Sequence, residues 1–178
     1  MPGHAHSPVH PSAPLPSVDP HNPYATLPAE LAALLDGERD WLVNLANTAA
    51  LLHLRLPELN WAGFYLWRGG ELVLGPFQGK PACTRIARGR GVCGTAAARH
   101  ATVVVPDVHA FPGHIACDSA SASEIVVPLA LPGRPLGVLD LDSPLRGRFT
   151  AADQTGLEEI ARILIAGTDW PADVGDRS

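Results

Sequence analysis

The pattern of hydrophobic and polar positions predicts helices at both ends of a folded region and strands between them. Apolar residues recur at helical spacing over residues 28–36 and 41–56, and again over 151–165, behind a capping-box pattern at 150–153. A short alanine-rich helix is expected to end near residue 100. β-rich runs cover residues 59–67, 71–78, 82–87, 102–105, 125–131 and 136–142.

Two pairs of these β-rich runs flank short turns that contain glycine. The turns are Arg68-Gly69-Gly70 and Pro132-Gly133-Arg134-Pro135, and each is typical of a β-hairpin. Hairpins make antiparallel neighbours, whereas parallel strands would need a crossover between them. The order of elements therefore predicts an α+β domain with a largely antiparallel sheet and helices packed on one face.

The first 26 residues are predicted to be a flexible, disordered arm. Eight of the 18 prolines lie in the first 28 residues, together with four of the eight histidines and no apolar periodicity. Such a composition buries too little surface to offset the entropy lost on ordering. One folded domain is expected over residues 27–167, followed by a C-terminal tail over 168–178.

Composition narrows the classes of function. Apolar residues make up 46% of the chain and charged residues 17%, which is typical of a globular domain. The net charge of -5 argues against a nucleic-acid partner, and no apolar run approaches the roughly 20 residues of a membrane span. Three cysteines are too few for the disulfide scaffold of a small secreted protein. We expect a soluble, cytoplasmic protein that binds neither nucleic acid nor membrane.

The three cysteines are the first candidates for chemistry. Cys83, Cys93 and Cys117 lack the close pairing of a zinc site, so no metal is expected there. Cys117 lies in an aperiodic stretch over residues 107–123, and Cys93 lies at an apparent helix start, where a thiolate is favoured. Buried hydrophobic cysteines and redox-active thiols both fit this pattern.

Two further patterns are typical of a metal site and of a dinucleotide-binding site. His100, His109 and His114 lie near enough in sequence to form a metal site. Residues 89–94 match the G-x-G-x-x-G pattern of dinucleotide-binding folds, and Asp107 follows at a plausible distance. The short helix after the glycines and the hairpins elsewhere argue against a dinucleotide-binding fold.

Three acidic residues stand among apolar neighbours. Asp140 and Asp142 are two residues apart on a predicted strand and share one face, and Glu124 directly precedes the adjoining strand. Carboxylates on paired strands repel one another unless a cation joins them, and an ammonium group or a divalent metal would serve. Trp61 and Tyr65 also share one strand face, as part of the core or as the wall of an apolar pocket.

Six segments together resemble one protein family. They are N-W-A-G-F-Y (60–65), L-G-P-F-Q-G-K-x-A-C (74–83), G-R-G-V-C-G-T-A (89–96), D-V-H-x-F-x-G-H-I-A-C-D (107–118), S-E-I-V-x-P-L (123–129) and G-V-L-D-L-D-S (137–143). In this order they resemble the free methionine-(R)-sulfoxide reductases, which are single GAF-domain enzymes. The resemblance runs from about residue 38 to residue 165 and includes all three cysteines.

The resemblance implies a GAF-like fold, with a central antiparallel sheet and helices packed on it, in a homodimer. It implies reduction of free methionine-(R)-sulfoxide without a cofactor, with thioredoxin as the reductant. A GAF domain that only senses a small ligand is the alternative function.

The resemblance also implies roles for individual residues. Cys117 corresponds to the nucleophile and Cys83 to its disulfide partner, while Cys93 is an alternative resolving thiol or even the attacking one. The acids that hold the substrate and the aromatic residues that take its methyl group correspond to Glu124, Asp140, Asp142, Trp61 and Tyr65.

Overall fold

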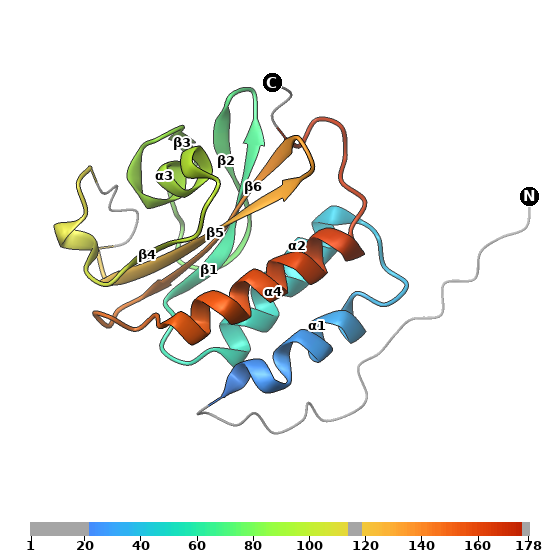
Figure 1. The fold of residues 1–178 in the computed structure, drawn as a ribbon, viewed down its shortest axis with the longest axis horizontal. Helices are drawn as coiled ribbons and strands as arrows, with labels where there is room; N and C mark the ends of the chain where they lie inside the picture. The colour runs from blue at the N-terminus through green and yellow to red at the C-terminus, as the bar shows by residue number, and fades with distance from the viewer. Residues whose placement is uncertain (1–21, 114–118, 176–178) are drawn as a thin grey trace, which may run out of the picture.

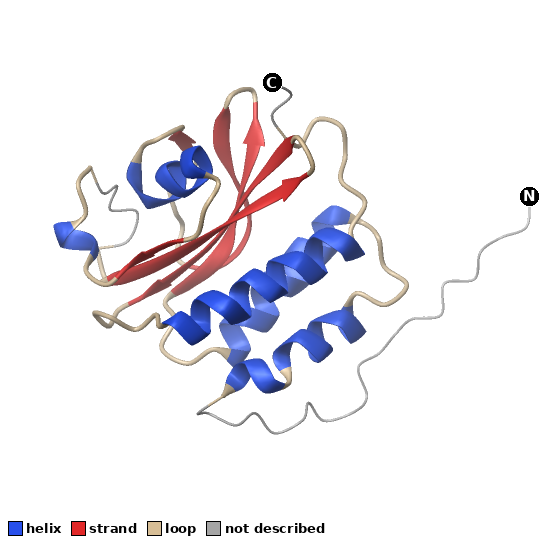
Figure 2. Cartoon of the chain, viewed as in Figure 1, coloured by secondary structure: helices blue, strands red, loops and turns tan. Residues whose placement is uncertain are grey.

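The centre of the protein is a six-stranded antiparallel sheet with strand order β3-β2-β1-β6-β5-β4 (Figures 1 and 2). This is seen in a computed structural model, which describes residues 22–113 and 119–175. The strands are β1 (Trp61–Arg68), β2 (Glu71–Gly79), β3 (Arg85–Ala87), β4 (Val103–Val105), β5 (Ser123–Leu131) and β6 (Arg134–Ser143). Both predicted hairpins are present, as β1–β2 and β5–β6.

Four α-helices and two short 3-10 helices accompany the sheet. They are η1 (Pro23–Ala25), α1 (Leu27–Leu34), α2 (Trp41–Arg55), α3 (Gly91–Arg99), η2 (Val108–Ala110) and α4 (Ala151–Gly167). The predicted capping box is confirmed, since Thr150 and Asp153 exchange hydrogen bonds at the start of α4. Among the helices of the described residues, none has the length and apolar character needed to cross a membrane.

The helices lie on both faces of the sheet, so the expectation of one covered face was wrong. α1, α2 and α4 cover one face, and α3 packs on the other (Figure 1). β1 explains the difference because it is buried on both sides: Phe64 faces the three helices, whereas Tyr65 faces the α3 side. A strand buried on both faces loses the apolar–polar alternation on which a one-face prediction depends.

The folded region extends beyond the predicted limits of residues 27 and 167. At the N-terminal end, η1 places Tyr24 against the helical core, and its hydroxyl donates to Asp153. At the C-terminal end, Val174 is fully buried, and the Arg134 guanidinium donates to the carbonyl oxygens of Pro171 and Val174. Residues 22–26 and 168–175 therefore belong to the packed domain rather than to an arm and a tail.

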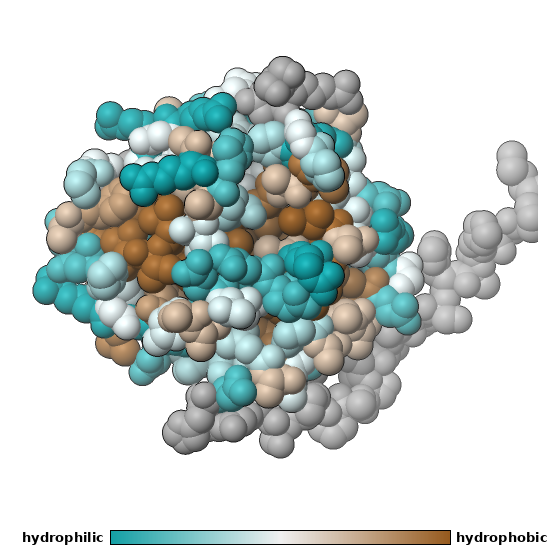
Figure 3. Space-filling model, in the orientation of Figure 1, coloured by the Kyte–Doolittle hydropathy of each residue, from teal (hydrophilic) through white to brown (hydrophobic). Residues whose placement is uncertain are grey.

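The surface carries an apolar groove between α4 and β5. Val127, Pro128 and Ile165 are among its lining residues, and Figure 3 shows brown surface there beside the teal side chains of α4. This groove lies on the helical side of the sheet. The pocket described next lies on the opposite side, under α3.

Candidate active site

Strand register brings the three predicted acids together with Trp61. On β6, Asp142 pairs with Glu124 of β5 on one side and with Trp61 of β1 on the other. Two residues along β6, Asp140 points to the same face. Three neighbouring strands therefore present these four side chains to one region of the sheet.

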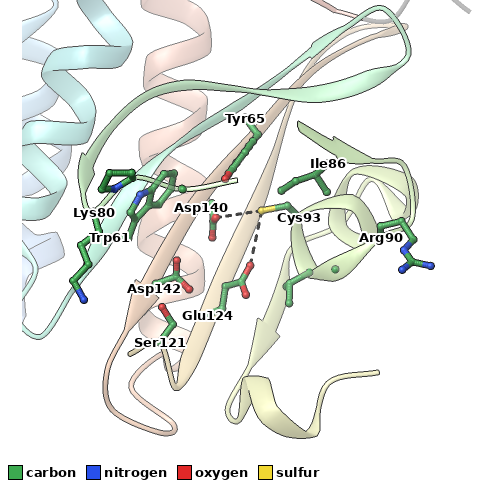
Figure 4. A pocket seen from close by; sticks show the side chains of 14 residues that line it. Trp61, Tyr65, Lys80, Ile86, Arg90, Cys93, Ser121, Glu124, Asp140 and Asp142 are labelled. Carbon is green, nitrogen blue, oxygen red and sulfur yellow. Dashed lines mark hydrogen bonds between the residues drawn. The ribbon is translucent and has the colours of Figure 1, made fainter. Parts of the chain in front are cut away.

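These side chains line a pocket between the sheet and the N-terminal end of α3 (Figure 4). The predicted residues Trp61, Tyr65, Cys93, Glu124, Asp140 and Asp142 all line it. The remaining lining residues are Lys80, Pro81, Ala82, Ile86, Arg90, Gly91, Val92 and Ser121.

One wall of the pocket is aromatic. The Trp61 ring stacks between two neighbours, with centroid distances of 5.9 Å to Tyr65 and 5.4 Å to Phe77. Gly63 makes this stack possible, since a Cβ there would lie 2.4 Å from the Phe77 Cβ. The Tyr65 hydroxyl donates to the carbonyl oxygen of Cys83 over 3.0 Å, which ties the wall to the segment that carries this cysteine.

Glycines set the position of Cys93 in the pocket. Gly89 and Gly91 adopt left-handed φ angles of 76° and 60°, and the Gly89 N–H donates to the Gly94 carbonyl over 2.9 Å. Gly94 lets α3 approach β3 closely, because a Cβ there would lie 2.5 Å from the Ala87 carbonyl oxygen. The G-x-G-x-x-G pattern is thus a tight turn into α3 beside an antiparallel sheet.

The thiol of Cys93 lies within reach of two carboxyl groups. Its Sγ donates to Asp140 Oδ2 over 3.2 Å and approaches Glu124 Oε1 at 3.8 Å, as the dashed lines in Figure 4 show. Asp140 is 5% exposed, and its other oxygen, Oδ1, is buried with no hydrogen-bond partner among the described residues.

Burial dominates the electrostatics of this cluster. It raises the pKa of Asp140 to about 7, against hydrogen bonds from Cys93 and Glu124 that lower it. Burial also raises the pKa of Glu124 well above its usual range, and the charges of Asp140 and Asp142 add to this effect. Both effects favour the protonated form of Glu124.

The expectation that the helix start would favour a thiolate at Cys93 was wrong. Burial raises the pKa of this thiol well above its usual range, and the neighbouring Asp140 and Glu124 raise it further. Desolvation and two acidic neighbours outweigh the dipole of a nine-residue helix. Cys93 is a free, buried thiol that carries its proton.

The cluster has the ligand spacing of a metal site. Ligand atoms of Cys93, Glu124 and Asp140 lie within 4.8 Å of one another. The contacts of the Cys93 thiol with the two carboxyl groups already account for this spacing, so we assign no metal to it. His100 and His109 do not join such a group in the described part of the chain, and His114 lies outside the described residues.

The other two cysteines differ from Cys93. Cys83 is disulfide-bonded, on the segment between β2 and β3 whose neighbours Pro81 and Ala82 line the pocket. Cys117, the predicted nucleophile, lies outside the described residues.

The sequence prediction missed Ser121 and the two cationic residues Lys80 and Arg90 at the pocket. Ser121 is buried and accepts a hydrogen bond from the Asn60 amide. Lys80 stands within the quoted motif of residues 74–83, so a requirement for charge balance beside three acids could have identified it. Arg90 likewise stands within the quoted motif of residues 89–96, whereas Ser121 gave no such signal, because only the fold brings its segment to the acids.

The fold and the pocket define the class of the protein, and comparison with known proteins agrees. The GAF domain family model matches residues 25–166, so the chain belongs to the GAF domain family.

Named relatives narrow the class. The chain is 55% identical to the free methionine-R-sulfoxide reductase of Escherichia coli over 150 residues, covering 83% of this chain and 91% of the relative. It is 46% identical to that of Saccharomyces cerevisiae over 139 residues, covering 74% and 77%. The X-ray structure of the Neisseria meningitidis enzyme in complex with its substrate superposes with a TM-score of 0.82 at 47% identity, covering 88% of this chain and 94% of that one. The chain therefore belongs to the free methionine-R-sulfoxide reductases, a family of oxidoreductases.

Proposed function

We propose that this protein reduces free L-methionine-(R)-sulfoxide to L-methionine. One observation carries the proposal: Asp140 Oδ1 is buried in the pocket with no partner among the described residues, beside two further acids and opposite an aromatic wall. A buried carboxylate oxygen requires a donor, and the ammonium group of a free amino acid supplies a charged one. The relatives of known name act on this class of substrate.

The pocket can accommodate both ends of such a substrate. Asp140, Asp142 and Glu124 form the acidic side, where the ammonium group binds. Trp61 and Tyr65 form the apolar side, where the S-methyl group packs against the rings. Lys80 and Arg90 also line the pocket and supply positive charge for the substrate carboxylate.

The proposed reaction transfers the sulfoxide oxygen to a cysteine. The thiolate of Cys117 attacks the sulfoxide sulfur and forms an S–S bond, while the sulfoxide oxygen gains a proton from a carboxylic acid. The S–O and S–S bonds to the methionine sulfur then break as the hydroxyl group passes to the Cys117 sulfur, so methionine leaves with the electron pair and Cys117 becomes a sulfenic acid. The thiol of Cys83 then condenses with the sulfenic acid, which forms a disulfide and releases water.

Thioredoxin completes the proposed cycle. Its dithiol reduces the enzyme disulfide by exchange and is itself oxidised to a disulfide. The disulfide-bonded state of Cys83 and the free state of Cys93 support Cys83 as the resolving residue. We place this cycle in the cytoplasm, where thioredoxin keeps thiols reduced.

The homodimer is part of the same proposal. Among the described residues, Leu42, Val43 and Leu54 of α2 are large apolar side chains exposed by 41–67%. Exposed apolar surface on one helix supports association of two copies. Light scattering of the purified protein should give twice the mass of the chain.

One assay tests the proposed substrate. Methionine released from the free R sulfoxide, the free S sulfoxide and N-acetyl-methionine-(R)-sulfoxide is measured with dithiothreitol as reductant. We expect turnover of the free R form only. Acetylation removes the ammonium charge and leaves buried acids unpaired, which lowers the rate by on the order of a hundredfold or more.

Two results would contradict the proposal. Similar rates for the free and acetylated R forms would show that the acids do not recognise the ammonium group. No turnover of any sulfoxide would favour the ligand-sensing GAF module.

A further inference from the structure

Cys93 has no task in a cycle that uses Cys117 and Cys83, yet it occupies the centre of the pocket. It is 4% exposed, and its sulfur lies against two acids at 3.2 Å and 3.8 Å. A resolving thiol must become a thiolate and reach a second sulfur. A thiol that is buried beside two carboxyl groups and within hydrogen-bond distance of both is instead suited to act as a hydrogen-bond donor.

The acceptor of this hydrogen bond, Asp140, is also the residue whose second carboxyl oxygen has no hydrogen-bond partner among the described residues. Asp140 Oδ2 accepts from Cys93, and Oδ1 has no partner among the described residues. The Tyr65 hydroxyl, the nearest phenol in the pocket wall, is committed to the carbonyl oxygen of Cys83. The thiol therefore fixes one oxygen of Asp140 and leaves the other for a ligand.

We propose that Cys93 is a positioning residue whose thiol donates to Asp140, holding this carboxylate ionised and oriented so that Oδ1 meets the substrate ammonium. The proposal rests on the proposed function for the identity of the ammonium ligand. A hydrogen bond to a charged acceptor stabilises the charged form, and burial of Asp140 works in the opposite direction. Without the thiol, only the hydrogen bond from Glu124 would oppose the effect of burial, and the pKa of Asp140 would rise further.

Other groups around Asp140 also influence its charge. Tyr65 of β1, Glu124 of β5 and Asp142 of β6 face it from the sheet, and Glu124 also hydrogen-bonds to Asp140, which lowers the pKa of Asp140 as the thiol does. Lys80 and Arg90 line the same pocket from the loops before β3 and α3 and favour the negative charge of Asp140. A substitution at position 93 leaves all five of them in place, so a change in the titration of Asp140 reports the lost thiol.

The test compares the full chain with its Cys93→Ala and Cys93→Ser variants. The ratio kcat/KM for free methionine-(R)-sulfoxide is measured against pH with dithiothreitol as reductant. We expect Cys93→Ala to move the acidic limb to higher pH by on the order of one unit, and to lower kcat/KM about tenfold along that limb. Cys93→Ser keeps a donor of similar size and should restore most of the profile.

This design separates positioning from resolution of the sulfenic acid. Dithiothreitol reduces the sulfenic acid directly, so loss of a resolving thiol alone would leave the acidic limb unmoved, and Ala and Ser would behave alike. Either of these results overturns the proposal. Thr95→Ala is the control on α3, since its hydroxyl donates to the Gly91 carbonyl and not to the acids.

A second measurement does not depend on turnover. Asp140 carries a carbon-13 carboxyl label, assigned with Asp140→Asn, and its titration is followed by NMR in the unliganded protein. We expect a higher titration midpoint in Cys93→Ala than in the wild type, and a return towards the wild type in Cys93→Ser. Equal midpoints would overturn the inference. An inactive wild type would instead refute the proposed function and leave this titration to decide the role of Cys93.

Discussion

At the scale of single residues, two carboxyl groups of the pocket have pKa values above those of the same groups in water. Burial raises the pKa of Asp140 to about 7, and it raises the pKa of Glu124 well above its usual range. A carboxyl group with a raised pKa in the folded state stabilises the fold fully only below its unfolded pKa of about 4. As pH rises from about 4 through 7, the unliganded protein loses this part of its stability.

Glu124→Gln should therefore stabilise the unliganded protein at alkaline pH. The glutamine amide has the shape of the protonated acid and cannot ionise, so no charge has to be buried at high pH. We expect a gain in the free energy of unfolding at pH 8 and no gain near pH 4, because only the ionised carboxylate of the wild type is disfavoured by burial. Urea unfolding at both pH values measures the free energy of unfolding. Turnover should be lost in this variant.

The control for this prediction is Glu159→Gln, which removes an exposed acid. Glu159 pairs with Arg162 on the outer face of α4, where the partner lowers its pKa. No gain at pH 8 is expected there. An equal gain in both variants would show that net charge, rather than burial at Glu124, determines the effect.

The cysteines give a second prediction at this scale. Cys117→Ser should abolish all turnover, whereas Cys83→Ser should release one equivalent of methionine per chain when no external thiol is present, because attack precedes resolution. Peptide mapping after one equivalent of sulfoxide should show a Cys83–Cys117 disulfide in the wild type. Multiple turnover by Cys117→Ser, or a Cys93–Cys117 disulfide, would contradict the assignment.

At the scale of elements, the sequence predicted the hairpins and caps well and the placement of α3 poorly. The turns at 68–70 and 132–135 and the cap at Thr150 are local signals, and the structure confirms them. The side of the sheet on which a short helix packs depends on contacts between distant residues. Here Trp61, Tyr65 and Trp67 of β1 bury the second face, and α3 covers them.

The start of α3 depends on Gly94 for its close approach to β3. In Gly94→Ala, the new Cβ would meet the Ala87 carbonyl oxygen at 2.5 Å, and a backbone atom cannot turn aside as a side chain can. We expect a loss of about 1–3 kcal/mol in stability and a displaced Cys93. Faster alkylation of Cys93, measured in the Cys83→Ser/Cys117→Ser background, would report the displacement.

Gly167→Ala is the matched control on α4. Its Cβ would meet only side-chain atoms of Leu35, of which the nearest is a terminal methyl group at 3.1 Å that can move aside. Stability should change little, and Cys93 should stay protected. Unchanged alkylation in Gly94→Ala would mean that this contact does not hold the thiol in place.

At the scale of the whole molecule, the site and the domain ends depend on pairings that sequence spacing does not encode. The shared face of Asp140 and Asp142 follows from their two-residue spacing, whereas the pairing of Glu124 with Asp142 requires the β5–β6 register. Hydrogen bonding between Cys93 and Asp140 requires α3 on that face. For the same reason, a proline-rich stretch with no periodicity did not reveal that residues 23–26 pack on the domain.

Tyr24 shows how this N-terminal segment is joined to the domain. Its ring lies over Gly156 of α4, where a Cβ would come within 2.1 Å of the ring, and its hydroxyl donates to Asp153 over 3.1 Å. Asp153 in turn caps α4 and pairs with Arg148. The glycine in the middle of the helix thus makes room for a residue more than 100 positions earlier in the chain.

The effect of Gly156→Ala on the free energy of unfolding should therefore have opposite signs in the presence and absence of Tyr24. In the wild type, the new methyl group displaces Tyr24, and we expect a loss of about 1–3 kcal/mol in the free energy of unfolding. In a Tyr24→Ala background the obstacle is gone, and the better helix propensity of alanine should give a gain of up to about 1 kcal/mol. Urea unfolding of the four proteins measures both effects as one double-mutant cycle. The same sign in both backgrounds would show that Tyr24 does not occupy this position in solution, and that the domain begins at α1.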